Sequence, residues 1–74
     1  MIYFFRRGPS ALSCETRLNP DGADYEMVIT EDDHVRTERF ETVAAMLSRE
    51  HELLAAWRAV GWREVGPSGR LPIS

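Results

Sequence analysis

A chain of 74 residues with 43% hydrophobic residues and a net charge of −3 has the length and composition of one folded domain. Its apolar content excludes intrinsic disorder, and its acidic balance is not typical of a protein that binds phosphate backbones. No apolar run is long enough to cross a membrane, and the apolar residues 1–5 precede Arg6 and Arg7, the reverse of a signal peptide. We therefore expect a cytoplasmic protein without a membrane partner.

The chain offers few residues for catalytic or metal chemistry. Cys14 is its single cysteine, which excludes a disulfide within the chain, and together with His34 and His51 it forms no zinc-ligand spacing. No serine stands in a nucleophile elbow, and the glycines do not follow a phosphate-binding spacing. We expect no cofactor, no bound metal and no enzymatic activity.

Four segments have the composition of strands, and turn signals separate them. They cover residues 2–7, 11–18, 25–30 and 34–40. In the second segment, alternation places Leu12 and Cys14 on one face, which we assign to the core. The strongest turn signal is at residues 19–22 (NPDG), where a type I turn would close with a left-handed glycine. In the fourth segment Val35 and Phe40 fall on opposite faces, so we expect a bulge or an early end there.

From residue 41 the hydrophobic period changes from two to 3.6, which predicts one amphipathic helix. Glu41 or Thr42 can cap its start, and Gly61 is placed to end it. The predicted apolar stripe consists of Val43, Met46, Leu47, Leu53, Leu54 and Trp57. Residues 63–65 suit a short edge strand, and the composition of residues 66–74 predicts a flexible tail.

The element order β-β-β-β-α predicts one α+β domain over residues 1–65, a four-stranded antiparallel meander with the C-terminal helix on one face. Because one helix covers only one face, the first strand must display aromatic side chains on the open face. We expect Tyr3 and Phe5 on the open face and Ile2 and Phe4 beneath the helix. A slip of one residue in this strand would exchange the two pairs.

Glu50 is the one polar residue inside the apolar stripe of the helix. A lone buried carboxylate is costly, so we expect a donor within hydrogen-bond reach, from the sheet or from a second subunit. Arg39 and Tyr3 are the candidates in this chain. The alternative is that Glu50 lines a small pocket between the helix and the sheet.

These observations favour a non-catalytic protein-interaction module that forms a homodimer through the open face or edge of its sheet. The candidate interaction residues are Tyr3, Phe5, Arg7, Arg17 and Glu50. The alternative is a protein that stacks single-stranded nucleic acid on the aromatic residues of the open face. Glu15 and Glu26 share that face with Arg17 and can pair with it, so any nucleic-acid binding should be weak and lost with salt.

Overall fold

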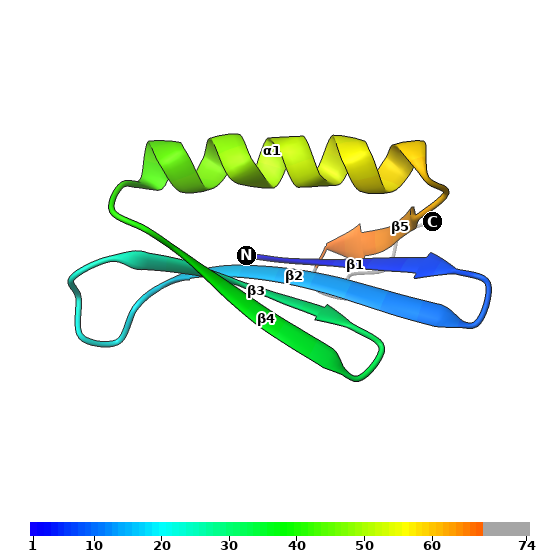
Figure 1. The fold of residues 1–74 in the computed structure, drawn as a ribbon, viewed down its shortest axis with the longest axis horizontal. Coiled ribbons are helices and arrows are strands. Elements are labelled where there is room, and N and C mark those ends of the chain that lie inside the picture. Colours follow the sequence, from blue (N-terminus) through cyan, green and yellow to red (C-terminus); the bar gives the residue numbers. More distant parts are fainter. Residues whose placement is uncertain (68–74) are drawn as a thin grey trace, which may run out of the picture.

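The computed structural model of the protein describes residues 1–67 and shows one five-stranded sheet with one helix packed against it (Figure 1). The elements are β1 (Ile2–Arg7), β2 (Ser10–Leu18), β3 (Tyr25–Glu31), β4 (His34–Phe40), α1 (Val43–Ala59) and β5 (Arg63–Pro67). The sheet order is β4-β3-β2-β1-β5, and every neighbouring pair is antiparallel. The predicted α+β meander is confirmed, and β5 extends it beyond β1. The rest of the predicted tail, residues 68–74, lies outside the described residues.

The hairpins turn where the sequence supplies residues that tolerate a positive φ. In the link from β2 to β3, Gly22 has φ +77°, and its N–H donates to the carbonyl of Asn19 at 2.8 Å, as a type I turn requires. Between β1 and β2, Gly8 has φ +59° in a link that places Arg7 opposite Ser10. This turn at Gly8 fixes which side chains of β1 face the core.

Strand β4 is regular along its whole length. It pairs with β3 from His34 opposite Glu31 to Phe40 opposite Tyr25, without a shift in register. The expected bulge or early end is therefore wrong. Phe40 packs against the core beneath the helix, whereas Val35 points to the other face and stays 64% exposed, which an edge strand tolerates.

Both ends of α1 have the caps that the sequence predicts. The Thr42 hydroxyl accepts a hydrogen bond from the Ala45 N–H at 3.1 Å. At the other end Gly61 has φ +99°, and the Trp62 N–H donates to the Trp57 carbonyl at 3.0 Å. This cap folds the chain back toward β1, where β5 begins.

The core lies between α1 and one face of the sheet. Its buried apolar members are Phe5, Leu12, Cys14, Met27, Ile29, Met46, Leu53, Leu54 and Trp62. The predicted helical stripe is too wide, because Val43 and Leu47 are about half exposed. The buried side of α1 is centred instead on Glu50, between Met46 and Leu53.

Candidate interaction surface

One face of the sheet carries the helix, and no described element covers the other, which we call the open face (Figure 1). The register aligns its side chains in rows across the strands. The two central rows are Ile2–Glu15–Val28–Thr37 and Phe4–Ser13–Thr30–Val35. The middle of the open face thus combines apolar side chains, small polar ones and the carboxylate of Glu15.

The open face is hollowed near β1. A shallow depression of about 440 Å³ lies over the ends of β1 and β2 that meet at the Gly8 turn. Phe4, Ser13, Thr30 and Val65 are among the residues that line it, together with the charged side chains of Arg6 and Asp32. Val65 is about half exposed, and Phe4 is half-buried, so this part of the face presents apolar surface to solvent.

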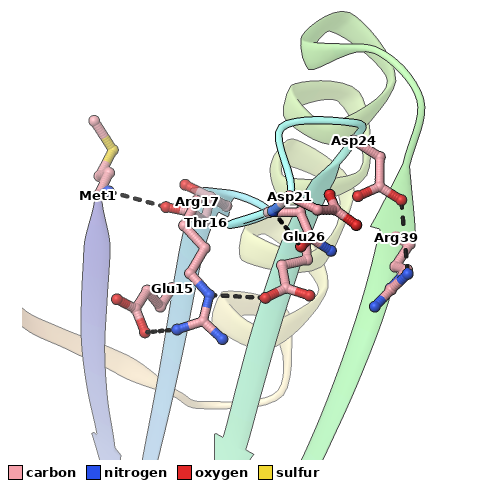
Figure 2. Close-up of polar contacts among 9 residues, drawn as sticks. Met1, Glu15, Thr16, Arg17, Asp21, Asp24, Glu26 and Arg39 are labelled. Atoms are coloured by element: carbon pink, nitrogen blue, oxygen red, sulfur yellow. Dashed lines mark hydrogen bonds and ion pairs between the residues drawn. The ribbon is translucent and has the colours of Figure 1, made fainter.

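A row of ion pairs borders the open face at the other end of the strands (Figure 2). The Arg17 Nε donates to Glu26 Oε1 at 2.9 Å, and its Nη1 lies 3.9 Å from Glu15. Arg39 lies 3.8 Å from Asp24. The expected pairing of Arg17 with Glu26 is confirmed. Each arginine here has a carboxylate partner, so the row contributes little net charge.

Tyr3 and Phe5 do not lie on the open face, so the predicted facing of β1 is wrong. Phe5 is 1% exposed and packs edge-on against Trp57, with 5.6 Å between ring centroids. Tyr3 is half-buried against the same core. The cause is the turn at Gly8: with Arg7 opposite Ser10, Phe5 falls opposite Leu12 on the core face. Ile2 and Phe4 therefore take the open face.

Arg7 also lies on the helix side of the sheet. Its guanidinium carbon lies 4.6 Å from the centre of the Trp62 ring, and its Nη1 donates to the Val60 carbonyl at 3.1 Å. These contacts hold the C-terminal end of α1 against β1. Arg7 thus has a structural role, and Arg17 is the one predicted interaction residue that the structure places on the open face.

Glu50 lies beneath α1 and is 6% exposed, and its Oε2 has no hydrogen-bond partner among the described residues. The expected donor is therefore not found within residues 1–67; Arg39, one of the candidates, pairs with Asp24 on the open face. Burial raises the pKa of the Glu50 carboxyl, and the N-terminal ammonium opposes this shift. The Glu50 charge adds to the rise in the pKa of Tyr3, which burial dominates.

Cys14 belongs to the same buried cluster. It is fully buried, and burial raises the pKa of its thiol to about 11, with the Glu50 charge as the second cause. A thiol with this pKa is not a nucleophile at neutral pH. Within residues 1–67 there is also no group of three or more side chains placed to hold a metal ion.

Comparison with known protein families, with curated proteins and with solved structures gives no match to this chain. The described part of the chain contains no helix long and apolar enough to span a membrane.

Sequence reasoning missed Ile2, Phe4 and Val28 as surface residues of the open face. For the two residues of β1 a signal was present. The two-residue link between Arg7 and Ser10 fixes the pairing of the first hairpin, and the core face of the second strand was already assigned from Leu12 and Cys14. Counting back from that turn places Phe5 with Leu12 and leaves Phe4 outside.

Proposed function

We propose that the protein is a small non-catalytic interaction module that forms a homodimer through the open face of its sheet. One observation supports this proposal above the others. A complete face of a five-stranded sheet lacks a covering element among the described residues, and its two central rows alternate apolar with polar side chains while paired charges lie at its border. Interfaces between proteins commonly combine apolar surface with a polar rim.

The area of the open face is sufficient for a stable pair. Strands about 4.8 Å apart that rise about 3.3 Å per residue give five strands of some six residues a projected area of roughly 480 Å². Two such faces bury on the order of 1,000 Å² in total, near the lower limit for specific interfaces. If about 57% of this area is apolar, at 25 cal/mol per Å² the gross gain is about 14 kcal/mol. Association costs offset much of it, so we expect dissociation in the micromolar range.

Nucleic-acid binding has less support. A stacking platform needs several aromatic side chains on one face, and Tyr3 and Phe5 lie beneath the helix. Phe4 is the aromatic residue that β1 places on the open face. Arg17 and Arg39 already pair with carboxylates. We therefore expect weak binding of a labelled oligonucleotide that physiological salt abolishes.

Light scattering coupled to size-exclusion chromatography tests the dimer. At about 100 µM, the wild-type protein should have a mass above that of a monomer. The double change Phe4→Thr and Val28→Thr places a β-branched residue that favours strands at both positions but removes apolar area, and it should lower the mass. Leu47→Ser removes an exposed apolar side chain from the helix, away from the open face, and is the control. A monomeric wild type, or a double variant with unchanged mass, would contradict the proposal.

A further inference from the structure

The two edges of the sheet differ in how they are protected. At one edge, β5 is a strand of five residues whose register with β1 shifts between Phe4 and Phe5, and it ends at Pro67, which has no N–H to donate. At the other edge, all seven residues of β4 pair with β3 in regular register, and β4 contains no proline or glycine. No described element pairs with its outer side. A long, regular edge of this kind is a template for another strand.

The backbone groups at the free edge of β4 can be assigned from its hairpin. The two-residue turn closes on the pair Glu31–His34, whose N–H and C=O groups point at each other. Along an antiparallel strand this direction alternates with each residue. Val35, Thr37 and Arg39 therefore direct their N–H and C=O groups away from β3, toward the free edge.

The residues before and after Thr37 in β4 are charged, and their side chains lie on the helix side of the sheet. Arg36 is exposed, and it makes no ion pair among the described residues. Glu38 accepts hydrogen bonds from Arg49 at 3.0 Å and 3.3 Å. A carboxylate has about four acceptor sites, so Glu38 can accept a further arginine. The strand thus carries one unpaired cation and one carboxylate with spare capacity, two residues apart.

We infer that β4 pairs antiparallel with β4 of a second copy of the chain, with Thr37 on the two-fold axis. In this register Arg36 of each copy lies opposite Glu38 of the other, so that two cross-strand ion pairs form. The outward backbone groups of Val35, Thr37 and Arg39 meet their counterparts in about six hydrogen bonds. The edge is therefore complementary to itself in both charge and backbone.

The same charges exclude the neighbouring registers. A shift of two residues in one direction places Arg36 opposite Arg36 of the second copy, and a shift in the other direction places Glu38 opposite Glu38. Like charges directly opposite each other are destabilising. The charges of β4 thus select one register, in the way that natural edge strands use charge against unwanted pairing.

This contact goes beyond the proposed function, because it uses the backbone edge of β4 and the side chains of Arg36 and Glu38 on the helix side, not the side chains of the open face. A two-fold axis perpendicular to the sheet keeps both helices on one side and joins the two open faces into one continuous surface. If both contacts form and their two-fold axes intersect at right angles, they close an assembly of four copies, a common symmetry of soluble oligomers.

Cysteine cross-linking tests the register directly. In Thr37→Cys the two cysteines face each other across the axis, with about 5.5 Å between their Cα atoms, which suits a disulfide. In the control Val35→Cys the two cysteines are four residues apart along the strands, roughly 13 Å, and cannot bond. Cys14 is fully buried and should not react. In a glutathione redox buffer we expect at least about tenfold more cross-linked dimer from Thr37→Cys; equal yields, or none from Thr37→Cys, would overturn the inference.

A charge reversal provides a second test of the β4 register. Arg36→Glu in the Thr37→Cys protein places two carboxylates opposite each other in both pairs and should reduce the cross-linked fraction about tenfold. Arg63→Glu makes the same change of charge at the exposed start of β5 and should leave the yield unchanged. An equal effect of both reversals would show that net charge, not the β4 register, controls the yield, and would overturn the inference.

The failures of the two proposals can be told apart. If Thr37→Cys cross-links as expected but Phe4→Thr with Val28→Thr leaves the mass unchanged, the open-face dimer fails and the edge contact stands. If the open-face variant lowers the mass and Thr37→Cys does not cross-link, the edge inference fails alone. A chain that pairs its β4 edge with a different protein would also leave Thr37→Cys uncross-linked.

Discussion

Glu50 provides the sharpest test of the core, because its carboxyl group is buried and the part of the chain that the structure describes offers no donor for Oε2. The change Glu50→Gln keeps the shape of the side chain and removes its titration. Burial raises the pKa of Glu50 in the native state above the value of about 4.3 of an unfolded chain. Between these two pKa values the native state binds more protons than the unfolded state. The stability of the wild-type protein must therefore fall as pH rises through this window, and it stays low above the native-state pKa.

The expected magnitude follows from the cost of a buried charge. Each pKa unit of difference corresponds to about 1.4 kcal/mol, and replacing buried ionic groups with neutral ones has stabilised other proteins by about 1–4 kcal/mol. A domain of this size has only about 3–5 kcal/mol from its core, so the effect should be visible. We expect Glu50→Gln to be close to the wild type in stability at pH 4 and more stable at pH 7.5. Glu50→Leu should be more stable at both pH values if its volume is accommodated.

Urea unfolding followed by tryptophan fluorescence measures this difference, because Trp57 and Trp62 both lie at the core. Other titrating groups contribute equally to the two proteins and cancel in the comparison. Glu52→Gln is the control, since Glu52 is exposed and pairs only with Arg49 among the described residues. The reasoning would be refuted if the difference in free energy of unfolding between Glu50→Gln and the wild type were the same at pH 4 and at pH 7.5. That result is expected of a solvated or paired carboxylate.

Three further changes test the packing described above. Phe5→Ala removes the ring that packs beneath the helix and should lower the free energy of unfolding by about 3–5 kcal/mol, enough to leave little folded protein in urea titrations. Cys14 should react with a thiol reagent at pH 8 only at the rate of unfolding, because burial raises its pKa to about 11; fast labelling of native protein would contradict its burial. Gly61→Ala forces a Cβ onto φ +99°, 3.5 Å from the Arg7 Cδ, and should cost at least about 1 kcal/mol, seen as a lower melting temperature.

Local chemistry was sufficient to predict the strands, the turns and the helix with its caps. Gly22 and Gly61 adopt positive φ where a turn and a helix end require it, and Thr42 caps the helix through its hydroxyl. Each of these features depends on a few consecutive residues. Their positions could therefore be predicted without knowledge of the tertiary structure.

The candidate site was harder to predict because it depends on which face of each strand is covered. β1 is apolar on both sides, so its own composition does not distinguish Tyr3 and Phe5 from Ile2 and Phe4. The decision comes from the first hairpin and the face of its partner strand. Glu50 shows a second limit of sequence patterns: a helical wheel places it in the core, but the position of a donor depends on side chains from distant strands.

The position of β5 has a consequence for how the native protein fluctuates. β1 pairs with β2 through a short hairpin, whereas β5 reaches β1 only after the chain has crossed the sheet as α1, and Tyr3 lies opposite Pro67. β5 is short, has a shifted register and pairs with no described strand except β1, so its release breaks one strand pairing and the ion pair of Glu64 with Arg58 and leaves the core beneath the helix in place. The native ensemble should therefore include a state of low free energy in which the sheet has four strands. In that state the amide groups of β1 that face β5 exchange with solvent, while those that face β2 remain protected.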